Sequence, residues 1–202
     1  MKQLVIIGAS GHGKVIADIA KKNGYEEILF LDDNDKLESC AGYPVVGKSE
    51  EVYGYKCDVA IGIGNAKIRK RIQNELEKAG VSLPVFVHPS AAIADGVTIG
   101  VGTVVVAGAV INPGAQIGKG CIINTCASVD HDCVVGDYVH VSVGAHLAGT
   151  VVVGECTWIG IGAVVSNNLN VAANCMIGAG ATVVGNIEEE GTYVGTPAKK
   201  KY

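Results

Sequence analysis

An aliphatic residue recurs at every sixth position over about half of the chain. From Ile93 to Val183 in steps of six, all sixteen residues are isoleucine, valine or leucine. This period fits neither an α-helix, which repeats every ~3.6 residues, nor a sheet with long connections. It is typical of short strands joined by turns in a parallel β-helix. The repeat therefore predicts that this segment folds as a β-helix.

A second series of small residues accompanies the first. Four residues after each aliphatic position stands another small or aliphatic side chain, from Val97 to Ile187. Cys121, Cys133 and Cys175 belong to this series, so we interpret them as small core residues rather than reactive thiols. Hydrophobic residues make up 49% of the chain and charged residues 18%, which excludes disorder over most of its length.

The charged residues divide the chain into three segments. Residues 1–82 carry 24 of the 36 charged side chains, whereas residues 83–187 and 188–202 carry six each. The first segment alternates predicted strands and helices, which indicates a small parallel sheet. We therefore expect a Rossmann-like α/β domain at 1–82, a β-helix at 83–187 and a C-terminal loop and tail at 188–202. The elements predicted in the first domain are strands at 3–7, 27–31 and 57–62 and helices at 14–23 and 66–78.

Composition also excludes several classes of protein. A net charge of −4 and an aromatic content of 5% argue against a nucleic-acid partner. The longest apolar run, Val101 to Ile111, is interrupted by glycine and is too short for a membrane span. The seven cysteines are odd in number and form no C-x-x-C pair, so we predict neither a zinc ribbon nor a disulfide framework. A reducing cytoplasm suits such a chain best.

The repeat segment has one conspicuous polar cluster, at Asp130, His131 and Asp132. Position 131 follows the inward Val129 by two residues, so packing gives no reason for a histidine there. A carboxylate beside a histidine orients the ring and raises its basicity, as a general base requires. From spacing alone, a polar bend in the β-helix explains the cluster equally well.

A longer stretch around this cluster carries a family resemblance. Residues 123–149 read INTCASVDHDCVVGDYVHVSVGAHLAG. They resemble the active-site stretch of the sialic-acid O-acetyltransferase type of sugar acetyltransferases, which includes UDP-4-amino-sugar (bacillosamine-type) N-acetyltransferases. This resemblance implies a left-handed β-helix with three hexapeptides per coil. It also implies His131 as general base, Asp132 as the carboxylate that raises its basicity, and Asn124 as a supporting polar residue.

The same resemblance implies where a coenzyme binds. It assigns His140 to acetyl-CoA near the thioester, and the backbone of Gly149, Ile161 and Ala179 to the pantetheine arm between neighbouring β-helices. A homotrimer, common in this family, follows as an expectation, and no metal is expected. The three lysines near the C-terminus are either contacts for the anionic end of coenzyme A or a frayed basic tail.

The first domain contains a glycine-rich loop, Gly8-Ala-Ser-Gly-His-Gly13, between a predicted strand and helix. Backbone N–H groups in such a loop can hold a phosphate, although the glycine order differs from the dinucleotide fingerprint. A tight strand–helix turn is the simpler interpretation. By resemblance, Ser10, Gly11 and His12 lie near the diphosphate and sugar of a nucleotide sugar. The nucleoside is then expected at Asp32, Asp33, Gly64 and Asn65.

The sequence therefore predicts an acetyl-CoA-dependent N-acetyltransferase acting on a nucleotide-linked amino sugar of the UDP-4-amino-4,6-dideoxy type, in glycan biosynthesis. Acetylation of a hydroxyl of sialic acid or another sugar is an alternative, because one base serves both acceptors. A second alternative is a non-catalytic oligomer that binds nucleotide sugars. A γ-type carbonic anhydrase is disfavoured, because the 131–140–146 histidine spacing lacks that family's five-residue histidine pair.

Overall fold

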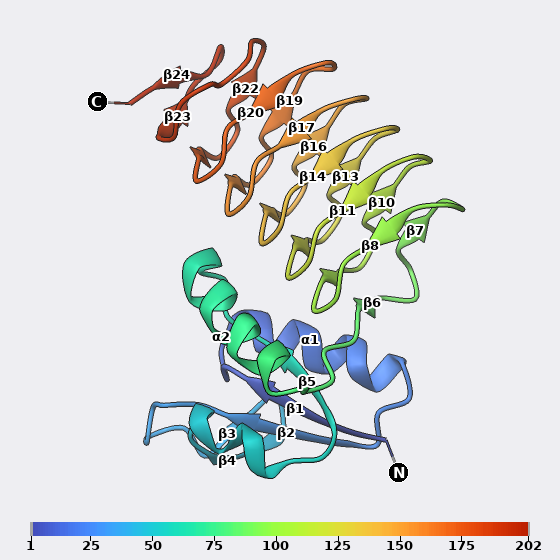
Figure 1. Ribbon diagram of the computed structural model, residues 1–202, viewed down its shortest axis with the longest axis vertical. Coiled ribbons are helices and arrows are strands. Elements are labelled where there is room, and N and C mark those ends of the chain that lie inside the picture. The colour runs from blue at the N-terminus through green and yellow to red at the C-terminus, as the bar shows by residue number, and fades with distance from the viewer. Residues whose placement is uncertain (1, 202) are drawn as a thin grey trace. The chain divides into compact units, whose positions relative to one another are not determined.

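The computed structural model describes residues 2–201 and divides the chain into two compact units, residues 1–89 and 90–202. Unit 1 is an α/β unit and unit 2 is a β-helix (Figure 1). The α/β and β-helix classes expected from the sequence are confirmed. The elements of unit 1 are β1 (Gln3–Ile7), α1 (Gly11–Lys22), β2 (Glu27–Leu31), β3 (Ser39–Cys40), β4 (Tyr43–Gly47), the 3₁₀-helix η1 (Ser49–Gly54), β5 (Asp58–Ile61), α2 (Ala66–Lys78) and β6 (Phe86–Val87).

The sheet of unit 1 has the strand order β3-β4-β2-β1-β5. All its pairings are parallel except that of β3 with β4. Val5, Ile7 and Leu31 are fully or almost fully buried in its core, as is Leu76 of α2. Because β2 and β5 flank β1 on opposite sides, chain direction across the sheet reverses at β1. In parallel sheets, ligands bind at the carboxyl ends of the strands beside such a reversal.

Unit 2 is a three-faced β-helix whose strands are two residues long for most of its length. Each coil contributes one strand to each of three parallel sheets, and residues 18 positions apart pair, as Val110 does with Ser128. Face 1 consists of β7 (Ala92–Ile93), β10 (Val110–Ile111), β13 (Ser128–Val129), β16 (His146–Leu147), β19 (Val164–Val165) and β22 (Thr182–Val183). Face 2 consists of β8 (Thr98–Ile99), β11 (Gln116–Ile117), β14 (Val134–Val135), β17 (Val152–Val153) and β20 (Asn170–Val171).

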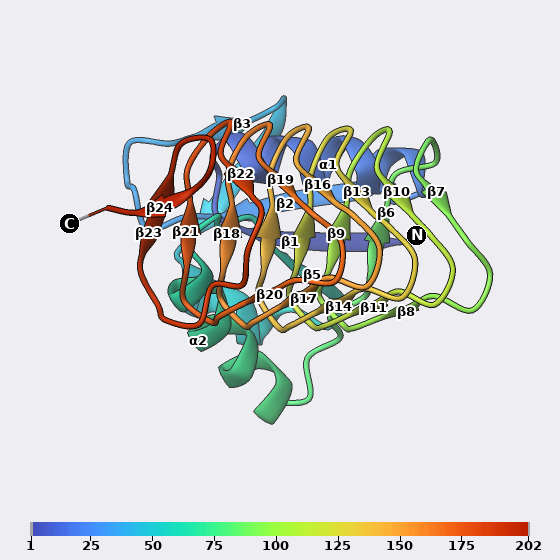
Figure 2. The same cartoon turned by 90° about the horizontal axis from the view of Figure 1, so that it is seen from above.

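Face 3 includes β9 (Val104–Val105), β12 (Ile122–Ile123), β15 (His140–Val141), β18 (Trp158–Ile159) and β21 (Met176–Ile177). The chain then adds β23 (Thr192–Val194) and the antiparallel β24 (Lys199–Lys200). Figure 2 shows face 3 as a row of neighbouring strands. The chain runs from face 1 to face 2 to face 3 in every coil, so each coil has three turns.

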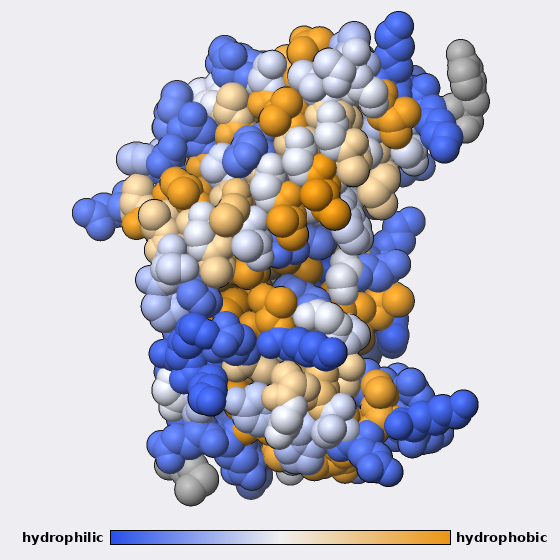
Figure 3. Space-filling view, turned by 180° about the vertical axis from the view of Figure 1, so that it is seen from behind, coloured by the Kyte–Doolittle hydropathy of each residue, from blue (hydrophilic) through white to orange (hydrophobic). Residues whose placement is uncertain are grey.

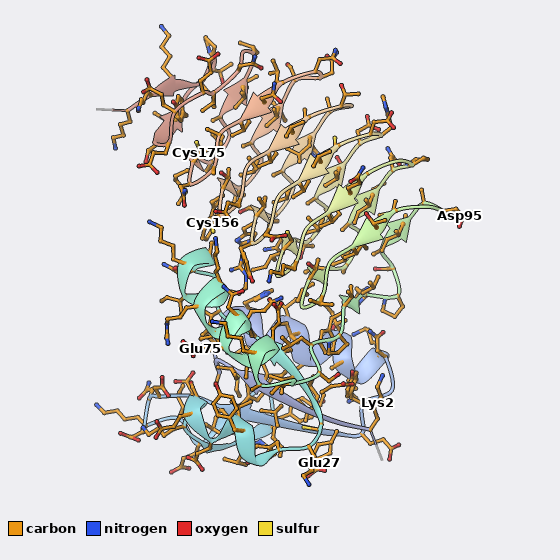
Figure 4. The ribbon with its side chains drawn as sticks, viewed as in Figure 1. Lys2, Glu27, Glu75, Asp95, Cys156 and Cys175 are labelled. Carbon is orange, nitrogen blue, oxygen red and sulfur yellow. The ribbon has the colours of Figure 1, made fainter. Side chains whose placement is uncertain are left out.

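The six-residue repeat fills the interior of the β-helix. Aliphatic residues of the first series, such as Ile111, Val129 and Ile159, have no exposed surface. The predicted core cysteines are buried as well: Cys175, labelled in Figure 4, has a 3.1 Å contact between its backbone nitrogen and the hydroxyl of Thr157. The interpretation of Cys121, Cys133 and Cys175 as core residues is therefore confirmed.

The turns repeat with the same period. Every sixth residue from Gly96 to Gly180 has a positive φ, and where that residue is not glycine the position is occupied by residues such as Asp132, with φ 57°. Aspartate and asparagine tolerate this left-handed conformation better than most side chains, because their short polar groups bond locally. The turn geometry thus places Asp132 at a fixed position between face 1 and face 2.

Candidate active site

His131 and Asp132 form a hydrogen-bonded pair in the turn between β13 and β14. The distance between Nδ1 of His131 and Oδ2 of Asp132 is 2.9 Å. The side chain of His131 is 57% exposed, so a substrate can reach it. The structure brings together the two residues expected to form the base.

The backbone of His131 is fixed on both sides. Its N–H donates to Oδ1 of Asp130 at 2.7 Å, and its carbonyl accepts from the N–H of Thr150 at 2.8 Å. Asp130 in turn accepts from Nδ2 of Asn112, also at 2.7 Å. Asn112 and Asp130 pair across adjacent coils, a contact that sequence reasoning missed although the two residues are one coil apart.

The carboxylates determine how His131 titrates. The hydrogen bond to Asp132 raises the pKa of His131 above its ordinary value, and the negative charges of Asp130 and Asp132 act in the same direction. Conversely, the hydrogen bonds from Asn112 and from the His131 backbone lower the pKa of Asp130. Asp132 holds the Nδ1 proton, so Nε2 of a neutral ring carries the free lone pair. This geometry can remove a proton from an amine or a hydroxyl.

A second polar pair links Asn124 to His140. Asn124 lies in the turn after β12, and His140 lies on the outward side of β15, where it is buried. The side-chain amide nitrogen of Asn124 is 3.0 Å from Nε2 of His140, and the His140 ring lies 4.5 Å, centroid to centroid, from that of Trp158. The sequence therefore led to both members of this pair but not to Trp158.

The three expected coenzyme positions lie in two different turns. Ile161 and Ala179, which are exposed, occupy the turns from face 3 to face 1. Gly149 occupies the turn from face 1 to face 2, one coil after His131, and is buried. A β-carbon built at Gly149 would lie 2.4 Å from Nε2 of His131, so this glycine contacts the ring of the predicted base.

The nucleotide-sugar residues expected in unit 1 meet at one edge of its sheet. Ser10, Gly11 and His12 begin α1, Asp32 and Asp33 follow β2, and Gly64 and Asn65 precede α2. All lie at the carboxyl ends of β1, β2 or β5, and the N-termini of both helices point to the same edge. The structure therefore brings these seven residues together.

Backbone hydrogen bonds tie the loops at this edge. The carboxylate of Asp32 accepts from the N–H of Ala9 at 2.7 Å and of Asn34 at 2.9 Å. Asp33 accepts from the N–H of Ser49, and this bond lowers the pKa of its carboxyl group. The side chain of Asn65 caps α2 by accepting from the N–H of Ile68. These contacts pre-form the loops in which a ligand would bind.

His12 is neutral in this environment. Burial, together with the charge of Arg69, lowers its pKa to about 4. Its Nε2 atom is buried and has no hydrogen-bond partner among the described residues. A neutral imidazole can offer one donor and one acceptor to a bound ligand.

Arg69 is a buried residue that the sequence reasoning missed. It is 1% exposed, and its guanidinium donates to the carbonyls of Ile63 and Gly64 at 3.0 and 2.8 Å. The signal was available, because Arg69, Gln73 and Leu76 follow the spacing of a single helix face and all are buried. Arg69 shapes the loop between β5 and α2.

A cavity of about 550 Å³ opens beside the same edge of unit 1. Its walls include the aliphatic side chains of Ile7, Ile63 and Ile68 and the charged side chains of Lys48 and Arg71. An apolar wall with cationic groups suits a planar base joined to an anionic chain.

The remaining histidines do not converge. His131 lies in a turn, His140 projects from face 3, and His146 bonds Ser128 on face 1 through Nδ1 at 2.8 Å. His88, predicted to shape the junction, lies 3.9 Å from Asp18 within unit 1. Among residues 2–201, no three histidine, cysteine, aspartate or glutamate side chains are grouped to hold a metal. No helix in that range is both long enough and apolar enough to traverse a lipid bilayer.

Known proteins resemble both units. Residues 3–76 match the PglD N-terminal domain. UDP-N-acetylbacillosamine N-acetyltransferase of Bacillus subtilis (strain 168) is 36% identical over 113 residues, which cover 53% of this chain and 52% of that protein. The alignment therefore spans about half the length of the curated relative.

Solved structures match along the whole length. The acetyltransferase domain of PglB from Neisseria gonorrhoeae FA1090, in complex with acetyl coenzyme A, is 40% identical, with 99% of each chain covered and a TM-score of 0.96. PerB from Caulobacter crescentus, in complex with CoA and GDP-perosamine, is 33% identical over 100% of this chain and 98% of that one, with a TM-score of 0.95.

A hexapeptide-repeat β-helix with a histidine–carboxylate pair in one turn, joined to an α/β unit, defines a class of acetyl-CoA-dependent acyltransferases. Within that class, the chain belongs to the sugar N-acetyltransferase family that includes the PglB acetyltransferase domain and perosamine N-acetyltransferase. The family resemblance found in residues 123–149 is confirmed.

Proposed function

We propose that this chain transfers the acetyl group of acetyl-CoA to the amino group of a UDP-4-amino-4,6-dideoxy sugar in glycan biosynthesis, with His131 as general base. The carrying observation is the 2.9 Å pair of His131 and Asp132. It occurs in a chain that matches acetyltransferase structures over nearly its full length.

In this proposal His131 moves one proton. Nε2 takes it from the acceptor amine as the amine nitrogen forms the amide bond, and returns it to the departing sulfur. Asp132 stabilises the imidazolium that exists between these two events. A base of this kind typically contributes ~10²–10⁴-fold in rate.

Acetyl-CoA would supply the acetyl group as an activated thioester. The exposed turns at Ile161 and Ala179 offer backbone groups to the pantetheine arm, and Asn124 holds the ring of His140 on face 3. The donors present therefore fit a long, flexible, amide-containing ligand that lies along the β-helix.

These positions support a homotrimer. Ile161 and Ala179 lie in turns from face 3 to face 1, whereas His131 and Gly149 lie in turns from face 1 to face 2. A neighbouring copy can bring the two kinds of turn together. Apolar side chains on the surface of the β-helix, visible as orange patches in Figure 3, suit such packing; they include Val143, Ile161 and Val164, which are 43%, 60% and 37% exposed.

For the acceptor, we propose the carboxyl edge of the unit 1 sheet. The diphosphate would bind at the N-terminus of α1 beside Ser10, Gly11 and His12, because free N–H groups there attract anions. Asp32, Asp33, Gly64 and Asn65 would hold the nucleoside next to the cavity. The cytoplasm, which keeps cysteines reduced, is the compartment we propose for the reaction.

Thiol release from acetyl-CoA across a panel of acceptors tests this function. The panel contains UDP-4-amino-4,6-dideoxy sugars, GDP-linked amino sugars, UDP-sugars without an amine, and free sialic acid. We expect turnover only with nucleotide-linked amino sugars, UDP-linked ones being preferred. Turnover with sialic acid would replace N- by O-acetylation, and silence with coenzyme A binding absent would favour the non-catalytic alternative.

A further inference from the structure

The ring of His131 rests on a glycine of the next coil. Gly149 stands 18 residues after His131, directly in register with it, as the bond from Thr150 N–H to the His131 carbonyl shows. A β-carbon at Gly149 would lie 2.4, 2.6 and 3.1 Å from Nε2, Cε1 and Cδ2 of His131. The ring therefore occupies the space that any other side chain at 149 would fill.

The carboxylate of Asp132 rests on a glycine of the preceding coil. Gly114 stands 18 residues before Asp132, and a β-carbon there would lie 2.4 Å from Oδ1 of Asp132. The hydrogen-bonded pair is thus bounded by one glycine in each adjacent coil. Neither contact is a hydrogen bond, so the pair has its orientation limited by shape as well as by polar partners.

We propose that Gly149 and Gly114 are positioning residues of the active site, whose missing side chains fix the orientation of the His131–Asp132 pair. This inference rests on the proposed function for its catalytic consequence. It differs from the coenzyme role expected of Gly149, which concerns only its backbone.

Gly149 is the more informative of the two. Gly114 has a φ of +77°, so its turn favours glycine whatever lies nearby, whereas Gly149 has no such conformation. Backbone conformation does not require glycine at 149, and the contact atoms there belong to an exposed side chain that can rotate away. An alanine at 149 is therefore expected to leave the fold intact while displacing the His131 ring.

The test is the Gly149→Ala variant of the full chain, with Gly185→Ala as the matched control. Gly185 belongs to the same β-helix, has no positive φ, and has nothing within 4 Å of the point that a β-carbon would occupy. We expect Gly149→Ala to reduce kcat about 10²-fold, the typical loss for a misplacement of ~1 Å. KM for both substrates should change less than about twofold, since alanine keeps the backbone N–H.

A second readout needs no substrate. Nitrogen-detected NMR titration of the five histidines reports the tautomer and pKa of His131 directly. In the wild type we expect an Nδ1–H tautomer with a raised pKa, and in Gly149→Ala a pKa closer to that of free histidine. Gly114→Ala, which displaces the carboxylate instead, should shift the titration in the same direction.

The outcomes separate the hypotheses. Unchanged kcat and an unchanged His131 titration in Gly149→Ala would overturn the positioning role. A raised KM for acetyl-CoA with normal kcat and titration would also overturn it, leaving a coenzyme contact alone. If the wild type transfers no acetyl group but His131 titrates as described and responds to Gly149→Ala, the proposed function fails while the structural role stands.

Discussion

The amide of Asn124 sets the tautomer of His140. Oδ1 of Asn124 accepts from the N–H of Thr125 at 2.8 Å, which directs Nδ2 toward Nε2 of His140. Since an amide nitrogen only donates, Nε2 of His140 accepts and carries no proton. The imidazole is therefore held in its neutral form with the proton on Nδ1.

Replacing Asn124 by aspartate would reverse this preference. A carboxylate accepts and cannot donate, so it would favour a proton on Nε2 of His140 and a charged ring. If His140 contacts acetyl-CoA as proposed, KM for acetyl-CoA should rise about tenfold, equivalent to ~1.4 kcal/mol, with a smaller change in kcat. Initial-rate kinetics measure both, and Asn170→Asp on face 2 is the control for the added charge.

His131 and Asp132 should determine the pH dependence of turnover. The base must be deprotonated, and its pKa is raised, so kcat/KM should increase with pH through an apparent pKa above the ordinary histidine value. Asp132→Asn removes the carboxylate; it should move this acid limb to lower pH and also reduce the plateau rate. His131→Ala should abolish the limb and lower kcat ~10²–10⁴-fold. A wild-type pH profile retained in Asp132→Asn would contradict the pairing.

His12 should make the protein sensitive to mild acid. Its pKa is about 4 when folded and 6.5 in an unfolded chain, so between these values only the unfolded state takes up the proton. Stability should consequently fall as pH decreases from 7 to 4, by about 3 kcal/mol from this residue alone. Urea unfolding of wild type and His12→Asn at both pH values measures it; an equal loss in the two proteins would refute the assignment.

Arg69 should contribute to both stability and ligand binding in unit 1. Arg69→Met would leave the carbonyls of Ile63 and Gly64 without the guanidinium, at a cost of roughly 3 kcal/mol. The loosened loop holds two predicted nucleoside contacts, so affinity for UDP should fall as well. Lys67→Met, on the exposed side of the same helix, is the control and should stay within about 0.5 kcal/mol of wild type. Calorimetry of unfolding and of UDP binding supplies both numbers.

The regular elements were predictable because each left a periodic signal. The strands at 3–7 and 27–31 and the helix at 66–78 match β1, β2 and α2. Helix α1 begins at Gly11, before the predicted Lys14, because the glycine-rich loop supplies its first turn despite poor helix propensity. The segment containing β3, β4 and η1 was not predicted; β4 alternates half-buried and exposed positions at the end of the sheet, so its hydrophobic pattern is weak.

The active-site contacts were only partly predictable. A histidine between two aspartates is visible in one dimension, and so is its proximity to a carboxylate. The contact of His131 with Gly149 is visible only after the coil length is known, since it joins residues one complete coil apart. Asn112–Asp130 obeys the same rule. Arg69 was missed because a charged residue on a buried helix face is assigned to the surface by charge alone.

The register of the β-helix restricts how the length of this chain can change. Each coil contains 18 residues, and a residue's face is fixed by its position within that count. An insertion or deletion of six residues would rotate every later residue by one face, separating Ile161 and Ala179 from the turns they occupy. Only whole coils can be gained or lost without such a rotation. Variation in length between functional homologues should therefore occur in multiples of 18 in this unit, or as loops that leave the turns without entering the count.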